Sequence, residues 1–172
     1  MSIRPILIAP DPRLKLTSEP VTEVNDQVRS LVADMIETMY DAEGIGLAAI
    51  QVGVAKRILV LDVEQKEDRR NARVFINPVI TWYSDATAVM EEGCLSVPEV
   101  WDEVERPQAI NATYLDADGV PQSLEAEGIL AVCLQHEMDH LNGVLFVDHL
   151  SKLKRSMVLK KLAKAKKLKK AG

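Results

Sequence analysis

A helix in the second half of the chain constrains the fold more than any other feature. The segment LAVCLQHEMDHLNG, Leu130 to Gly143, is rich in apolar residues and ends in a glycine that suits a helix C-cap. We therefore expect a helix from Glu127 or Gly128 to Asn142. Because this helix is largely apolar, other elements have to pack around it, and it is expected to lie at the centre of the fold.

The remaining segments predict an α+β fold in which antiparallel strands pack around this central helix. An N-terminal helix is expected over Asn25–Ala42, where apolar residues recur at helical spacing and Asn25 or Asp26 can cap the start. Asp118-Gly119 is a two-residue hairpin signal between the last two predicted strands. The predicted strands are Arg57–Val63, Arg73–Ile80, Glu99–Pro107, Ala109–Asp116 and Val120–Glu127.

Charge divides the chain into an acidic body and a basic tail. Residues 151–172 contain ten Lys or Arg and no acidic residue, whereas residues 1–150 contain 11 basic and 26 acidic side chains. At 172 residues the chain is expected to form one main domain over residues 1–150. Residues 151–172 are expected to form a basic C-terminal helix that belongs to the same domain or extends from it as a docking element.

The C-terminal helix allows two interpretations. Its apolar residues could dock on the body as a stripe while its lysines stay in solvent, or its lysines could contact nucleic acid. A membrane-surface helix is disfavoured because the stripe is thin and lacks aromatic residues, and no apolar run approaches the roughly 20 residues of a membrane span. The stripe residues are Leu153, Met157, Leu162, Ala165 and Leu168.

The N-terminus and the cysteine content predict a cytoplasmic location. The first ten residues, MSIRPILIAP, lack the long apolar run and the small-residue cleavage site of a secretory signal. The two cysteines, Cys94 and Cys133, are then expected in a reducing compartment, where thiol or metal chemistry is favoured over a disulfide.

The central helix carries a pattern typical of metal-dependent hydrolases. His136 and His140 stand four residues apart, so they lie about 40° apart on one helix face, where both imidazoles can meet one cation. Glu137 flanks this position without having to be a ligand, which suits a general base that acts on water. The alternative is two ordinary histidines on a helix. Apolar residues on the same face favour a buried, poorly hydrated site, and these are Ile129, Val132 and Cys133.

A catalytic metal usually has three protein ligands and an open position, so a third ligand is needed. The candidates are Cys94, Cys133, His149 and a carboxylate. Cys133 lies on the apolar face and suits packing, since a free cysteine behaves like a small hydrophobe. Cys94 follows Gly93, which allows a close turn, and precedes Pro98, which makes the exit rigid. A thiolate on such a turn is the better third ligand.

Three motifs together resemble the signature of the peptide deformylase family. They are GIGLAAIQ (Gly44–Gln51), EGCLS (Glu92–Ser96) and QHEMDH (Gln135–His140), in the family's order and at similar separations. The resemblance covers about residues 1–150. It implies a metal-dependent hydrolase that removes the formyl group from the N-terminal formyl-methionine of nascent polypeptides and releases formate.

The resemblance also implies roles for individual residues. Cys94, His136 and His140 would be the metal ligands, and the Gln51 amide and the backbone N–H of Leu95 would stabilise the oxyanion that develops during the reaction. Gly44 and Gly46 let the backbone approach the substrate, and their alternative role is a plain helix stop. An apolar slot for the methionine side chain would be lined by Ile45, Gly46, Ile129, Val132 and Cys133, although simple core packing also explains the last three.

The ligand set leaves the metal open. A thiolate with two imidazoles suits Zn²⁺, Fe²⁺, Co²⁺ and Ni²⁺. The resemblance implies Fe²⁺ in the cell, with Zn²⁺, Ni²⁺ or Co²⁺ as alternatives in purified protein. Residues that could orient the histidines are Glu92, Arg106, Gln135 and Asp139, which the sequence does not pair.

Two features remain outside the core motifs. Some family members carry an arginine a few residues beyond EGCLS, and this chain has Trp101 near that position. The difference affects the expected binding of the peptide beyond its first residues and leaves the catalytic residues intact. Bacterial relatives use a C-terminal helix to dock on the ribosome. If the basic tail of this chain contacts nucleic acid, we therefore expect it to dock on the ribosome in the same way.

Two rival functions share part of the pattern. A zinc peptidase also contains HExxH, but its third ligand lies downstream, where Asp148 and His149 are the near candidates, and EGCLS would go unexplained. A structural metal site would need a fourth protein ligand, for which Cys133 would have to leave its apolar surroundings.

Overall fold

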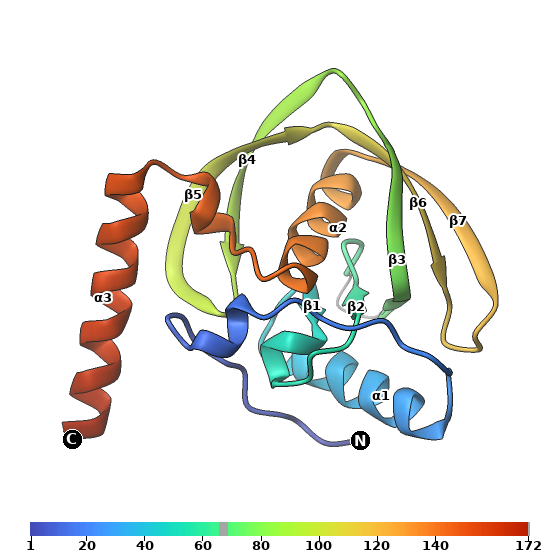
Figure 1. The fold of residues 1–172 in the computed structure, drawn as a ribbon, viewed down its shortest axis with the longest axis horizontal. Coiled ribbons are helices and arrows are strands. Elements are labelled where there is room, and N and C mark those ends of the chain that lie inside the picture. Colours follow the sequence, from blue (N-terminus) through green and yellow to red (C-terminus); the bar gives the residue numbers. More distant parts are fainter. Residues whose placement is uncertain (66–68, 172) are drawn as a thin grey trace.

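The structure, a computed structural model, describes residues 1–65 and 69–171 and has the predicted α+β architecture (Figure 1). The helices are α1 (Asp26–Asp41), α2 (Gly128–Leu141) and α3 (Lys152–Ala171), with short 3-10 helices η1 (Pro12–Lys15), η2 (Ala49–Val52) and η3 (Phe146–His149). The strands are β1 (Gly46–Ala48), β2 (Ile58–Leu61), β3 (Arg73–Tyr83), β4 (Thr87–Cys94), β5 (Val97–Pro107), β6 (Ala109–Leu115) and β7 (Pro121–Glu127).

The strands form two antiparallel sheets that curve around α2. Five strands are ordered β1-β2-β3-β6-β7, and β4 pairs with β5 in a separate two-stranded ribbon. The chain passes directly from β3 to β4 and from β5 to β6, so two long ribbons arch over the central helix (Figure 1). This arrangement confirms the prediction of antiparallel strands around the central helix.

Helix α2 packs its apolar face against the five-stranded sheet. Ala131, Leu134 and Leu141 are completely buried against residues of β2, β3 and β6, including Leu59 and Phe75. Burying a leucine side chain contributes about 1.5–3 kcal/mol to stability. The packing therefore fixes the rotation of α2, and with it the direction in which the opposite face points.

Helix α1 matches its prediction closely. The Asn25 side chain caps the helix by accepting a hydrogen bond from the Val28 N–H at 3.0 Å. Met35 and Met39 are completely buried in a second core region, which packs against the short strand β1. This region supports the GIGLAAIQ segment from below in the view of Figure 1.

Two strands were not predicted, and one turn was predicted incorrectly. Strand β1 has only three residues, and β4 carries charged residues and lies half-exposed in its ribbon, so neither gives an apolar strand pattern. The hairpin at Asp118-Gly119 exists, but its loop has three residues, because the Asp116 N–H donates to the Val120 carbonyl at 3.0 Å. Gly119, at φ +78°, takes the left-handed conformation that such a loop requires.

Helix α3 lies at the edge of the molecule, beside β5 (Figure 1). It contacts the body through Val158, Leu159 and Leu162, of which only Leu162 belongs to the predicted apolar stripe. Leu153, Met157 and Leu168 of that stripe are more than 60% exposed. The predicted stripe was therefore wrong in most of its members. The helix docks on the body through a narrow face formed by Val158, Leu159 and Leu162.

The last residue of the predicted tail, Gly172, lies outside the described residues. Among the helices of residues 1–65 and 69–171, none combines the length and the apolar composition that crossing a membrane requires.

Candidate metal centre and active site

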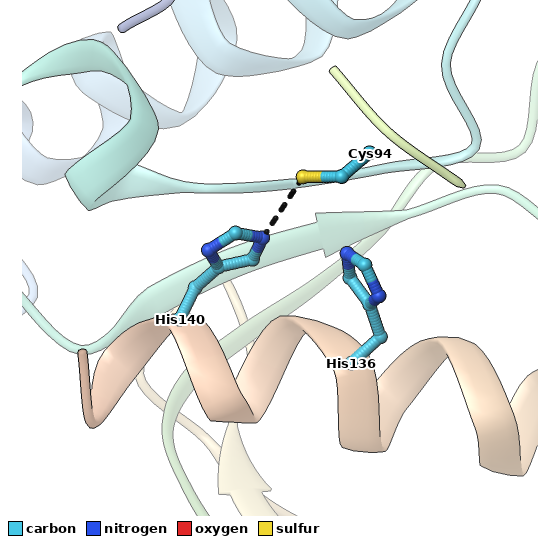
Figure 2. A group of neighbouring side chains, drawn as sticks. All are labelled: Cys94, His136 and His140. Atoms are coloured by element: carbon cyan, nitrogen blue, oxygen red, sulfur yellow. Dashed lines mark hydrogen bonds between the residues drawn. The ribbon is translucent and has the colours of Figure 1, made fainter. Parts of the chain in front are cut away.

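Cys94, at the end of β4, meets His136 and His140 of α2 (Figure 2). One ligand atom from each residue lies within 4.8 Å of the other two, and Cys94 Sγ is 3.4 Å from His140 Nε2. Both imidazoles project from α2 toward the sulfur (Figure 2). A soft thiolate with two imidazoles is a donor set for divalent transition metals, so these three residues fit a metal ion.

His136 is oriented by a buried carboxylate. Its Nδ1 lies 2.9 Å from Glu92 Oε1, which leaves Nε2 directed toward the group of ligand atoms. Arg106 holds Glu92 in a two-point pair, with Nε to Oε2 at 2.7 Å and Nη2 to Oε1 at 3.0 Å. Burial opposes ionisation, but hydrogen bonds from His136 and Arg106 outweigh it and keep the pKa of Glu92 below its usual range.

Asp139 connects the buried pair of Arg106 and Glu92 to His149 at the surface. Arg106 Nη1 donates to Asp139 Oδ2 at 2.9 Å, and His149 Nε2 lies 2.8 Å from the same oxygen. Of the four candidates for orienting the histidines, the structure thus joins Glu92, Arg106 and Asp139. Gln135 is the exception, since its amide donates to backbone carbonyls of Pro107 and Ala131.

Glu137 is a buried acid next to the ligand group. Burial raises its pKa to about 7, although the nearby His136 opposes the rise. Its Oε1 lies 3.9 Å from His136 Nε2, and its Oε2 has no hydrogen-bond partner among the described residues. A Cβ at Gly46 would come within 2.8 Å of Oε1, so the glycine allows the β1 backbone to lie against this carboxyl group.

Gln51 lies in η2, and its side chain reaches the thiol of Cys94. Its Oε1 accepts a hydrogen bond from the Ala48 N–H at 2.9 Å. Its Nε2 donates to Ser96 Oγ at 3.0 Å and lies 3.6 Å from Cys94 Sγ. The amide donor therefore faces the group formed by Cys94, His136 and His140. Sequence reasoning did not single out Ser96, and the available signal was its polar side chain inside the EGCLS motif.

These residues lie around one cleft with a volume of about 440 Å³. His140 is the one predicted site residue that does not line it, and it is completely buried. The predicted residues that line the cleft are Gly44, Ile45, Gly46, Gln51, Cys94, Leu95, Ile129, Val132, Cys133, His136 and Glu137.

The apolar part of the cleft includes Cys133. Burial, reinforced by the nearby Glu137 and Glu92 carboxylates, raises the pKa of its thiol to about 12. The thiol is therefore neutral and packs like a small apolar group. Val132 is buried beside it, whereas Ile45 and Ile129 are partly exposed at the opening.

Trp101 forms part of the rim of the cleft and is 67% exposed. Its six-membered ring lies directly on Gly93, where a Cβ would come within 2.3 Å of the indole. Glycine at position 93 is therefore required for this packing. The indole adds a broad apolar surface to the rim of the cleft.

The alternative ligands do not belong to the group formed by Cys94, His136 and His140. Asp148 pairs with Lys15 at 2.6 Å and with Arg155 at 2.9 Å, and His149 bonds Asp139. Cys133 is not part of the ligand group. The geometry thus does not support the peptidase arrangement, nor a structural site closed by Cys133.

Comparison with known proteins identifies the family. A family model described as polypeptide deformylase matches residues 3–156. The chain belongs to the polypeptide deformylase family. It is 59% identical over 177 residues to the peptide deformylase of Rhizorhabdus wittichii, covering 100% of both chains.

Solved structures agree. The peptide deformylase of Legionella pneumophila has a TM-score of 0.91 and 45% identity, covering 99% of each chain. That of Ehrlichia chaffeensis in complex with actinonin has a TM-score of 0.90 and 47% identity, covering 96% of this chain and 98% of that one. The chain is therefore a metal-dependent hydrolase that removes the N-terminal formyl group from nascent peptides and releases formate.

Proposed function

We propose that deformylation in this chain uses Cys94, His136 and His140 as metal ligands and Glu137 as general base. The observation that carries the proposal is the meeting of three ligand atoms within 4.8 Å beside a buried carboxyl group in one cleft. When bound, a divalent ion supplies Lewis acidity, which polarises the formyl carbonyl and makes water nucleophilic at neutral pH.

Glu137 carries the proton through the reaction. Its carboxylate takes a proton from the attacking water, and a pKa near 7 matches this task at neutral pH. Oxygen adds to the formyl carbon, and the carbon–nitrogen bond of the formyl amide then breaks. Glu137 returns the proton to the departing amine, so formate and a free N-terminal methionine are the products.

Two donors oppose the negative charge that develops on the formyl oxygen. The Gln51 Nε2 group faces the sulfur of Cys94 at 3.6 Å, and the Leu95 backbone N–H follows Cys94 in the chain. Donors that are already in position cost no reorganisation at the moment of reaction, and removing one typically lowers kcat by about 10² to 10³.

The substrate is held by the apolar half of the cleft. We assign the methionine side chain to the slot lined by Val132, Cys133 and Ile129, which closes against Ile45. The absence of side chains at Gly44 and Gly46 lets the peptide backbone lie close to β1. The neutral thiol of Cys133 suits a thioether better than a charged group would.

Metal dependence and formyl specificity are tested together. The purified protein is expected to release formate from formyl-Met-Ala and not acetate from acetyl-Met-Ala. Chelator treatment should abolish the release, and added divalent metal should restore it. Absence of formate release from the metal-loaded protein would contradict the proposal.

We propose Fe²⁺ as the ion in the cell, with Zn²⁺, Ni²⁺ or Co²⁺ in protein purified in air. The thiolate and imidazole ligands accept all four ions, so cellular supply and oxidation decide the occupant. Elemental analysis of protein purified with and without oxygen is the test. Zinc as the dominant metal under strict anaerobic purification would contradict the assignment.

We further propose that residues 1–150 carry catalysis and that residues 151–172 dock on ribosomal RNA. Every lysine and arginine of α3 whose side chain is described is exposed, and the apolar contact to the body uses one narrow face. The cationic face is therefore available to phosphate groups.

Ribosome co-sedimentation across a salt series tests this docking. A variant with several α3 lysines, such as Lys160, Lys161 and Lys164, changed to glutamine keeps Leu162 and the fold. It should bind ribosomes more weakly and with a shallower salt dependence, while formyl-Met-Ala turnover stays unchanged. Equal ribosome binding by the wild type and the lysine-to-glutamine variant would contradict docking through α3. We also propose a cytoplasmic location for this reaction, because neither Cys94 nor Cys133 forms a disulfide, as is usual in a reducing compartment.

A further inference from the structure

Ser96 is completely buried in the turn between β4 and β5, two residues after Cys94. Its hydroxyl oxygen lies 3.0 Å from Gln51 Nε2 and accepts a hydrogen bond from it. Gln51 is also buried, with 1% of its surface exposed. A buried hydrogen bond between two such groups restricts the position of both side chains.

The orientation of the Gln51 amide follows from its other partner. The Ala48 N–H can only donate, so the amide atom that faces it at 2.9 Å has to be the oxygen. The NH₂ group therefore faces Ser96 and Cys94. Because this group is planar, fixing one N–H on Ser96 Oγ also fixes the direction of the second N–H, on the side where Cys94 Sγ lies at 3.6 Å.

The main chains of both residues are held by one N-terminal segment. The Leu7 N–H donates to the Gln51 carbonyl at 2.7 Å, and the Ala9 N–H donates to the Ser96 carbonyl at 2.8 Å. Ala9 itself is buried. Gln51 and Ser96, which are 45 residues apart in sequence, are thus fixed relative to each other by backbone as well as side-chain contacts.

We propose that Ser96 is a positioning residue for deformylation, which holds the Gln51 amide so that one N–H points at the formyl oxygen. Ser96 does not touch the substrate, and it acts only through Gln51. The inference rests on the proposed role of Gln51 as an oxyanion donor. It gives the final serine of the EGCLS segment a defined task in the reaction.

A double-mutant cycle tests the proposal. Ser96→Ala should lower kcat on formyl-Met-Ala about tenfold and change KM less than about twofold, since only the transition state uses the donor. In a Gln51→Ala background, the same Ser96→Ala change should alter kcat by less than about twofold. Ser18→Ala is the matched control, because Ser18 is a second buried serine whose hydroxyl bonds no group within the described residues.

The possible outcomes separate the two proposals. If Gln51→Ala leaves kcat unchanged, the oxyanion role of Gln51 fails, and the role of Ser96 fails with it. If Gln51→Ala is impaired but Ser96→Ala lowers kcat equally in both backgrounds, Gln51 keeps its role and the positioning by Ser96 is wrong. If Ser96→Ala behaves like Ser18→Ala, positioning is also wrong.

A spectroscopic measurement does not depend on turnover. In zinc-loaded protein labelled with ¹⁵N-glutamine, the Gln51 side-chain NH₂ signals are assigned by their loss in Gln51→Ala. Ser96→Ala should shift these signals and speed their exchange with solvent. The Gln135 NH₂ group donates to Pro107 and Ala131, and its unchanged signals would show that the fold is intact. Unchanged Gln51 signals in Ser96→Ala would overturn the proposal.

Discussion

Helices α2 and α3 both carry ionisable side chains, but α2 buries most of them and α3 exposes them. Glu137 and both histidines of α2 lie in the interior, whereas each described lysine and arginine of α3 is exposed. Burying a charge without a partner is costly, so Glu92 beside α2 is paired with Arg106, whereas burial of Glu137, whose Oε2 has no partner among the described residues, raises its pKa to about 7. Charge near α2 therefore serves geometry and chemistry, while charge on α3 remains available to a partner.

The largest expected effect comes from removing a ligand beside α2. Cys94→Ala should lose its metal on dialysis against a chelator and lose activity with it. Cys133→Ala should keep the metal, since this neutral thiol lies outside the ligand group, and should mainly alter the fit for methionine. Metal content of the two variants is the measurement. Equal loss in both, or loss only in Cys133→Ala, would reverse the ligand assignment.

The next effect compares a buried ion pair with an exposed one. Arg106→Met leaves Glu92 and Asp139 without their common cation in the interior, and should lower the free energy of unfolding by about 3–5 kcal/mol. Arg155→Met, which removes a half-exposed pair of α3 with Asp148, should cost less than about 1 kcal/mol. Urea unfolding of both variants checks the difference. Similar costs would mean that the burial of charge does not distinguish the two helices.

A smaller effect tests how α3 is attached. Leu162→Ala should cost about 2–3 kcal/mol, because Leu162 is 7% exposed and packs against the body. Leu168→Ala on the same helix should stay within about 0.5 kcal/mol, because Leu168 is 65% exposed. Thermal or urea unfolding is the measurement. A neutral Leu162→Ala would show that α3 does not depend on this contact.

The smallest effect concerns the rim of the cleft. Trp101→Ala should raise the KM of formyl peptides longer than two residues about fivefold, the equivalent of about 1 kcal/mol for an aromatic contact. Formyl-Met-Ala should be unaffected. Trp82→Ala is the control, since Trp82 is an exposed tryptophan of β3 outside this cleft. An equal response to short and long peptides would show that Trp101 does not contact the peptide beyond its first residues.

The sequence predicted the helices better than the strands, for a physical reason. Helical periodicity is a local property, so Met35 and Met39 of α1 could be placed on a buried face from spacing alone. Strand β4 is recognised only by its pairing with β5, because its positions alternate between exposed and half-buried and its one fully buried side chain, Glu92, is charged. The docking face of α3 was not predicted, because it consists of only three apolar residues and gives no longer periodic pattern in the sequence.

For the site, too, the sequence predicted what depends on local spacing and motifs and missed what depends on contacts between distant segments. Helical spacing and the three motifs predicted that His136, His140 and Cys94 would meet, and the structure brings them together, while their roles stay predictions. The pairing of Arg106 with Glu92 and Asp139 could not be predicted, because it joins positions 14 and 33 residues apart on different elements. Such contacts depend on the curvature of the ribbons around α2.

The central claim is that Glu137 moves the proton at a metal held by its neighbours, and Glu137→Gln tests it most directly. Glutamine keeps the size of the side chain and removes the ability to take a proton, so the fold and the metal content should match the wild type. Formate release from formyl-Met-Ala should fall by about 10² to 10⁴. A metal-loaded Glu137→Gln variant that turns over at the wild-type rate would contradict the account.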